Sequence, residues 1–276
     1  MKIHFTKMHG LGNDFVLIDT ISQPVHLTDA HFQRLGDRRL GIGCDQILLV
    51  EKARLAEADF AYRIFNNNGE EAEQCGNGAR CFARFVYEQG LTQKTDLTIQ
   101  TRQGLIYSSL TSDGQVVVNM GLPHFQPNHI PFIAQEESVT YPLIIEGKTY
   151  IINAISMGNP HAVQFVDAVD EAPVETLGPH IASHPRFPHK VNAGFVEIGS
   201  PLHIKLRVFE RGAGETLACG TGACAAVVAG IQRHLLKNTV KVDMRGGSLT
   251  ISWQGAGQPV FMTGPAVTVF HGEIVL

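Results

Sequence analysis

The sequence predicts an α+β fold of two pseudo-symmetric domains, each a mainly antiparallel sheet wrapped around a central helix. Three observations predict it. Most segments are short strand-like runs bounded by turn residues. The segment Ala223–Ile231 is apolar on every side, which is typical of a helix buried all round. A Cys-Gly-x-Gly-Ala motif occurs twice, at Cys75 and Cys219, 144 residues apart (219 − 75) in a chain of 276.

The repetition extends beyond the two cysteines. Gly12-Asn13 and Gly158-Asn159 each precede an apolar run, at an offset of 146 (159 − 13). Gln46 and Asn192 also lead into apolar runs, again offset by 146 (192 − 46). Paired elements in the same order indicate two related halves and not a short-period solenoid. We expect one domain over residues 1–119 plus 265–276 and the other over 120–264.

The individual elements follow from local patterns. Ten strands are expected as β-type runs, at 47–50, 60–65, 97–101, 115–120, 151–156, 162–166, 203–209, 240–244, 249–253 and 266–270. Four helices are expected, at 28–38, 76–88, 174–183 and 220–234. Thr28 is an N-cap candidate for the first, and Gly90 ends the second. Arg80 and Arg84 interrupt the second helix, so we expect one of its faces to reach outward.

Composition excludes several classes of function. The formal net charge is −4 and the pI about 6.3, which argues against a nucleic-acid partner. No apolar run reaches the roughly 18 residues of a membrane span, and the start lacks a signal peptide. A cytoplasmic, soluble protein is expected, with no membrane partner. Its five cysteines are then expected to be reduced, and an odd number also fits a disulfide framework poorly.

The paired motifs point to acid/base chemistry. A helix N-terminus presents unpaired N–H groups and a partial positive charge, so it binds carboxylates and lowers the pKa of a thiol placed there. Glycines at 76, 78, 220 and 222 let the backbone approach a ligand closely. Two thiols on opposite faces of one α-carbon could remove a proton and return one with inversion. This chemistry needs no cofactor, and none is expected; no metal motif is present in the sequence either.

Longer motifs around the cysteines resemble a known family. Asn66-Asn-Asn-Gly-Glu with Cys75-Gly-Asn-Gly-Ala-Arg resembles the first signature of diaminopimelate epimerases. Glu210-Arg-Gly-Ala-Gly-Glu-Thr with Cys219-Gly-Thr-Gly-Ala resembles the second. Lys7-Met-His-Gly-Leu-Gly-Asn-Asp-Phe and Met157-Gly-Asn-Pro-His161 match as well. The resemblance runs from residue 3 to nearly the end.

The resemblance implies a PLP-independent two-base isomerase that interconverts LL- and meso-2,6-diaminoheptanedioate in lysine biosynthesis, with Cys75 and Cys219 as acid and base. It also implies roles for the residues around them. The amides of Gly76, Asn77, Gly220 and Thr221 would hold the reacting carboxylate, and Glu210 with the Arg211 backbone the reacting ammonium. The distal end would be bound by Asn66, Asn159, Asn192 and the Arg211 side chain, with Asn13 and Gln46 completing the pocket. His161 and Glu210 would tune the thiols.

A homodimer is also implied by the resemblance. The family often has Tyr on its C-terminal strand, associated with the dimer interface, where this chain has Phe270. The dimer expected here therefore lacks that hydroxyl.

Other interpretations stay open for single residues and for the whole chain. Cys44, Cys81 and Cys224 fit small core residues. Asn66 and Asn159 could be turn formers, His161 a satisfied core histidine, and Arg211 a surface partner of Glu215. Gly220-Thr-Gly-Ala resembles a dinucleotide loop, but it does not directly follow a buried strand. A racemase of another amino acid, of the proline type, is the alternative enzyme. A redox or ligand-binding protein that uses the cysteine pair is the alternative outside enzymes.

Overall fold

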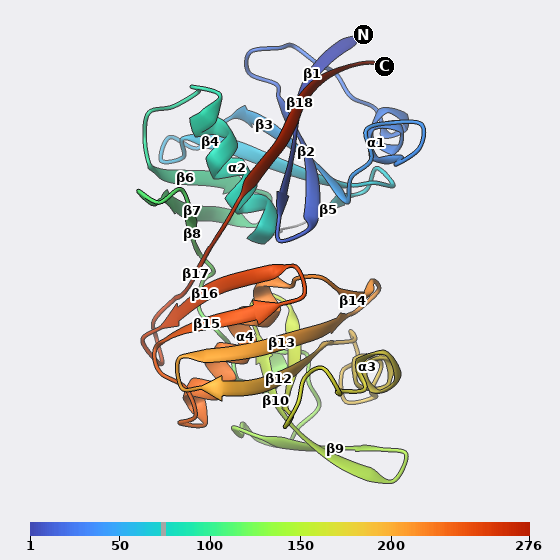
Figure 1. The fold of residues 1–276 in the computed structure, drawn as a ribbon, viewed down its shortest axis with the longest axis vertical. Coiled ribbons are helices and arrows are strands. Elements are labelled where there is room, and N and C mark those ends of the chain that lie inside the picture. Colours follow the sequence, from blue (N-terminus) through green and yellow to red (C-terminus); the bar gives the residue numbers. More distant parts are fainter. Residues whose placement is uncertain (73–75) are drawn as a thin grey trace. The chain divides into compact units, whose positions relative to one another are not determined.

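The computed structural model describes residues 1–72 and 76–276, which divide into two compact units. Unit 1 comprises Met1–Asn119 and Thr263–Leu276, and unit 2 comprises Met120–Met262. Unit 2 is therefore one continuous stretch, whereas unit 1 uses both ends of the chain. Figure 1 shows the two units in sequence colours.

Unit 1 is a mixed sheet with two helices. Its strands pair in the order β18-β1-β2-β3-β4-β6-β7-β8, and β5 pairs with the end of β4. Among these pairings only β2–β3 and β4–β6 are parallel. Helix α2 packs against β1, β2, β3, β7 and β8, so the sheet curves around it. The elements are β1 (Lys2–Gly10), β2 (Asn13–Asp19), α1 (Asp29–Gly36), β3 (Gln46–Lys52), β4 (Phe60–Asn66), β5 (Glu71–Ala72), α2 (Gly76–Glu88), β6 (Asp96–Thr101), β7 (Gly104–Leu110), β8 (Val116–Asn119) and β18 (Val267–Val275).

Unit 2 repeats this arrangement. Its strands pair in the order β9-β10-β11-β12-β13-β15-β16, and β14 pairs with the end of β13. Here β11–β12 and β13–β15 are the parallel pairs. The elements are the short helix η1 (Pro127–His129), β9 (Tyr141–Ile145), β10 (Lys148–Ser156), β11 (Pro160–Phe165), α3 (Val174–Ala182), β12 (Asn192–Ser200), β13 (His203–Glu210), β14 (Gly214–Thr216), α4 (Gly220–Gln232), β15 (Thr239–Met244), β16 (Gly247–Trp253) and β17 (Val260–Gly264), which reaches the unit boundary.

The pairing pattern confirms the two related halves. Strands β1 to β4 of unit 1 correspond to β10 to β13 of unit 2, with the same sense at every step. Helices α2 and α4 each have 13 residues and begin 144 positions apart (220 − 76). The predicted α+β fold, with a sheet around a helix in each half, is therefore correct, although each sheet is mixed.

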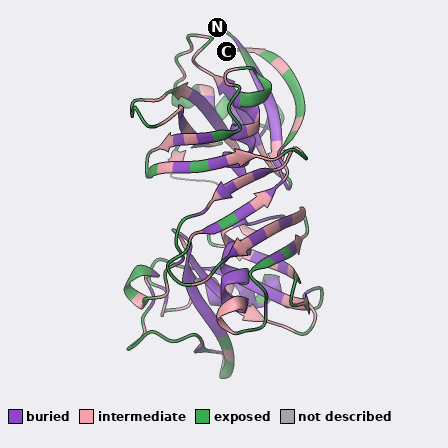
Figure 2. Ribbon diagram, turned by 90° about the vertical axis from the view of Figure 1, so that its left-hand side faces the viewer, coloured by how far each residue is buried: buried purple, intermediate pink, exposed green. Residues whose placement is uncertain are grey.

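The central helices are buried in different ways. Helix α4 is buried along nearly its whole length, as its uniformly apolar sequence predicts, and purple residues run through the strands of each unit in Figure 2. In α2, the expectation that Arg80 marks an outward face is wrong, because Arg80 is fully buried. Its guanidinium donates to Asn77 Oδ1 at 3.0 Å and to the Pro265 carbonyl at 3.1 Å, which offsets the cost of burying the charge. Arg84, in contrast, is partly exposed and pairs with Glu88.

The four predicted helices are confirmed, with small differences at their ends. Helix α4 ends at Gln232, two residues earlier than predicted. His234 adopts a left-handed backbone (φ 58°), and the Leu235 N–H donates to the Gly230 carbonyl at 2.9 Å. This is the hydrogen bond of a Schellman-type helix end. Each predicted strand run falls on a strand, and the structure adds further strands, including β1, β7, β9 and β17.

Candidate active site

In unit 2, Cys219 lies at the start of α4. It is the N-cap residue, with an extended backbone (φ −126°, ψ 107°), and only 4% of its surface is exposed. A Cβ at Gly222 would lie 3.2 Å from the Cys219 Sγ, so glycine at this position leaves room for the thiol beside the first turn. The thiol thus lies at the positive end of a buried helix.

Opposing effects act on the pKa of this thiol. Burial and the nearby Glu210 carboxylate raise the pKa of Cys219 well above its usual value. Hydrogen bonds from the Thr221 hydroxyl, 3.7 Å from Sγ, and from the Gly222 amide partly oppose that rise. Cys219 is therefore a protonated thiol at neutral pH, with donors in place for its thiolate form.

His161, on β11, connects to the thiol through Thr221. Its ring is buried, and Nε2 lies 3.0 Å from both Asn159 Oδ1 and Thr221 Oγ1. Burial, with a contribution from the Arg211 charge, lowers the pKa of His161 to about 3, so the imidazole is neutral. Since an amide oxygen only accepts, Nε2 carries the proton. The Thr221 hydroxyl then accepts from the ring and can donate its own proton to Sγ.

Further polar groups of unit 2 hold Glu210 and Arg211 in place. The Asn192 Oδ1 accepts from the Arg211 backbone N–H at 2.9 Å, and the Arg211 guanidinium donates to the His189 carbonyl at 2.9 Å. The Thr216 hydroxyl donates to Glu210 Oε1 at 2.6 Å. The suggested surface pair of Arg211 with Glu215 is wrong, because Glu215 accepts from other arginines.

In unit 1, four of the predicted residues form two hydrogen-bonded pairs. Gln46 Nε2 donates to Asn66 Oδ1 at 3.0 Å, and Asn77 Nδ2 lies 3.3 Å from Asn13 Oδ1. The Gln46 Oε1 atom is buried and has no hydrogen-bond partner among the residues that the structure describes. A buried acceptor without a partner is costly unless a ligand donor meets it. Gly76, the first residue of α2, is half-buried and directly precedes Asn77.

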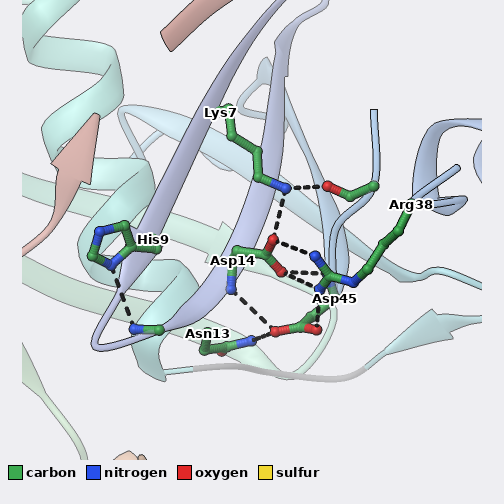
Figure 3. Close-up of polar contacts among 8 residues, drawn as sticks. Lys7, His9, Asn13, Asp14, Arg38 and Asp45 are labelled. Atoms are coloured by element: carbon green, nitrogen blue, oxygen red, sulfur yellow. Dashed lines mark hydrogen bonds and ion pairs between the residues drawn. The ribbon is translucent and has the colours of Figure 1, made fainter. Parts of the chain in front are cut away.

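An ionic network fixes the position of Asn13 (Figure 3). Asp45 accepts from the Asn13 side chain at 2.9 Å, and Arg38 bridges Asp45 and Asp14 at 2.8 and 2.7 Å. Lys7 pairs with Asp14 at 2.7 Å and also donates to the Gly43 carbonyl. Burial opposes ionisation of Asp14, but hydrogen bonds from Arg38 and Lys7 outweigh it and hold the pKa of the carboxyl well below its usual range. Sequence reasoning missed this network, although Asp14 directly follows Asn13 in a matched motif.

The predicted site residues thus fall into two groups, one in each unit. Cys75 lies outside the described residues, directly before the first residue of α2. The core interpretation of Cys44, Cys81 and Cys224 is confirmed, since each is fully buried. The described part of the chain contains no cluster of His, Cys, Asp and Glu that could hold a metal ion. Its helices are all too short or too polar to cross a membrane.

Known proteins match both halves of the chain. The model of the diaminopimelate epimerase family matches residues 5–126 and 153–269. A diaminopimelate epimerase of Nitrosospira multiformis is 58% identical over 276 residues, covering 100% of this chain and 99% of the relative. Another from Aromatoleum aromaticum is 60% identical over 274 residues, covering 99% of both.

Solved structures of proteins with much lower sequence identity have the same fold. A hydroxyproline epimerase from Agrobacterium vitis superposes with a TM-score of 0.70 at 15% identity, over 99% of this chain and 92% of that one. A probable proline racemase from Agrobacterium radiobacter gives 0.69 at 16% identity, over 99% and 93%. The fold is therefore that of the proline racemase and epimerase structures. With the family match and the 58–60% identities, the chain belongs to the diaminopimelate epimerase family and is an isomerase.

Proposed function

We propose that the chain interconverts LL- and meso-2,6-diaminoheptanedioate by moving an α-proton between two thiols, without a cofactor. The observation that carries the proposal is the position of Cys219. It is a buried thiol at the N-terminus of a buried helix. Burial and the Glu210 carboxylate raise its pKa, and the Thr221 hydroxyl opposes that rise. The names of the relatives supply the substrate.

In this mechanism Cys75 and Cys219 would act on opposite faces of the α-carbon. One thiolate removes the proton while the other thiol delivers one, and the roles exchange in the reverse direction. The raised pKa of Cys219 keeps it protonated at neutral pH, which is the form that delivers a proton. The Thr221 hydroxyl and the helix N-terminus stabilise the thiolate that forms as the proton leaves.

The difficult step is the carbanion-like transition state, since an amino-acid α-proton is far less acidic than a thiol. Preorganised dipoles in a site without water are the effect that can compensate. The amides of Gly220 and Thr221, with those of Gly76 and Asn77, would hold the reacting carboxylate as charge develops on it. Glu210 and the Arg211 backbone would hold the reacting ammonium.

The distal end of the substrate distinguishes this reaction from that of a proline-type racemase. The similar relatives do not favour such a racemase either. A one-ended substrate has no use for Asn66, Asn159, Asn192 and the Arg211 side chain. The Gln46 Oε1, which has no hydrogen-bond partner in the described part of the chain, is suited to accept a hydrogen bond from an ammonium group of the substrate. We therefore assign Gln46 and Asn13 to the same pocket.

Location and assembly complete the proposal. A reaction that depends on two free thiols fits the reducing cytoplasm, and its product serves lysine biosynthesis. We propose a homodimer through β18, where Val267, Val269, Phe270 and Val275 are 41–65% exposed. Several exposed apolar side chains on one strand are typical of an interface.

The decisive experiment is incubation of the purified protein with LL-diaminopimelate in heavy water. The expected product is the meso isomer with deuterium at one α-carbon, formed without added cofactor. Cys219→Ala and Cys75→Ala should each abolish inversion. Deuterium-free product, or near-native turnover in either variant, would refute the two-thiol mechanism. Equal turnover of proline would favour the alternative racemase.

A further inference from the structure

Each unit contains the same bidentate Arg–Glu ion pair, in which two guanidinium nitrogens bind the two carboxylate oxygens, on the strand hairpin that precedes its central helix. In unit 1, Arg63 of β4 meets Glu71 of β5, with nitrogen–oxygen distances of 2.9 and 3.0 Å. In unit 2, Arg207 of β13 meets Glu215 of β14 at 2.7 and 2.9 Å. Both partners are offset by 144 (207 − 63 and 215 − 71), the same offset as the helix starts. The pair therefore belongs to the repeated design of the halves.

Strand register gives the pair its geometry. Glu215 lies opposite Phe209, and Arg207 comes two residues before that phenylalanine, so the two charges are diagonal neighbours across the hairpin. Because a guanidinium binds both carboxylate oxygens at once, the contact fixes orientation as well as distance. Glu215 also comes four residues before Cys219, on the short strand that leads toward the thiol.

The pair of unit 2 is the more deeply buried of the two. The Arg207 and Glu215 side chains are 17% and 5% exposed, against 42% and 26% for the pair of unit 1. Arg207 also donates to the carbonyls of Val169, Asp170 and Ala172, and Arg245 lies 3.2 Å from Glu215. Hydrogen bonds from Arg207 lower the pKa of Glu215, so its charge persists at neutral pH. An isolated exposed ion pair contributes little, whereas losing one partner of a buried pair is costly.

Contacts lead from this pair to the thiol. Strand β14 has three residues and is paired along β13 alone among the strands described, which makes it marginal without further support. Thr216 follows Glu215 directly, and its hydroxyl donates to Glu210 Oε1 at 2.6 Å. We propose that Arg207 and Glu215 are positioning residues of the active site, which hold β14 so that Thr216 keeps Glu210 beside Cys219. The assignment rests on the proposed function for the catalytic role of Cys219.

The test compares Glu215→Gln with two controls. Glu71→Gln neutralises the equivalent pair in the other unit, and Lys241→Gln removes an exposed ion pair of unit 2, with Asp243 at 3.0 Å. The rate of Cys219 alkylation by iodoacetamide is followed across pH by peptide mass spectrometry, and kcat and KM are measured in parallel. Circular dichroism establishes that each variant is folded at the assay temperature.

We expect Glu215→Gln to shift the Cys219 alkylation profile about one pH unit lower, an about tenfold faster reaction below the thiol pKa. The reason is that the Glu210 charge is no longer held beside the thiol. The kcat value should fall about tenfold with a smaller change in KM, while Lys241→Gln behaves as the native protein. Glu71→Gln should leave the Cys219 profile unchanged.

An unchanged Cys219 profile in folded Glu215→Gln, or an equal shift in Glu71→Gln, would overturn the assignment. If Glu215→Gln does not fold, Arg207→Lys takes its place, because it keeps the charge and loses the bidentate contact. A shifted Cys219 profile would again support the assignment, and an unchanged one would overturn it. Alkylation needs no substrate. A native protein without epimerase activity would therefore refute the proposed function and still leave the positioning role to be decided by this comparison.

Discussion

The Thr221 hydroxyl is the group through which the site can be tested with the smallest change in shape. Thr221→Val keeps the branched side chain and removes the hydroxyl that lies 3.0 Å from His161 Nε2 and 3.7 Å from Cys219 Sγ. A hydrogen bond to a charged group is worth about 1.5–3 kcal/mol. Since 3.7 Å is long even for sulfur, we take the lower end, about 1.5 kcal/mol, which corresponds to an about tenfold loss in kcat.

The assay is the conversion of LL-diaminopimelate followed by chiral chromatography, together with the pH profile of Cys219 alkylation. The profile should move to higher pH, because the Thr221 hydroxyl lowers the thiol pKa in the native protein. His161 keeps its contact with Asn159, so the fold should be retained. Thr221→Ser restores the hydroxyl and should recover most of the activity. Native kcat and an unshifted profile in Thr221→Val would refute the reasoning.

Three further changes test the structure elsewhere. Asp14→Asn should lower the free energy of unfolding by about 3 kcal/mol, measured by denaturant titration, because Lys7 would lose its buried partner. The folded pKa of Asp14 lies below its unfolded value of about 3.9, so the native protein has this stabilisation above that pH and loses it as the pH falls further. The variant should therefore lose less stability in acid, and an equal loss in both would contradict the network. Gly222→Ala should reduce kcat while the protein stays folded, since its Cβ would crowd Sγ at 3.2 Å; unchanged kcat would show that the thiol can shift without cost. Phe270→Asp should give monomers in light-scattering chromatography, and an intact dimer would move the interface away from β18.

The fold was largely predictable because its strongest signals are local and repeated. A helix apolar on every side, as at Ala223–Ile231, fits only a fully buried position, and α4 is buried. The paired offsets of 144 to 146 predict two related halves from the sequence alone. Arg80 misled the prediction for α2, because a charge inside a helix normally marks a solvent face. Its partners, Asn77 and the carbonyl of Pro265 far along the chain, are found only once the fold is known.

For the candidate site, the sequence predicts a set of residues but not their contacts. Sequence motifs placed Cys219, His161 and Thr221 in one site, yet the hydroxyl of Thr221 as the link between the other two appeared only in three dimensions. The Arg207–Glu215 pair recurs at the 144-residue offset in the sequence, but its contact is not evident there, since charges eight residues apart meet only in one register of one hairpin. Such diagonal contacts require strand pairing that composition and periodicity leave open.

The last strand has a consequence for how the molecule is made. Strand β18 pairs along nearly the full length of β1, and the terminal residues Met1 and Leu276 are hydrogen-bonded to each other at 2.5 and 2.9 Å. During translation, β1 can therefore pair with β2 early, but its other neighbour, β18, is made after all the other described strands. Unit 2, a continuous stretch, can fold on the ribosome while unit 1 still lacks one edge of its sheet. An exposed strand edge invites pairing with other chains, so the order of synthesis leaves unit 1 the half most exposed to misassembly.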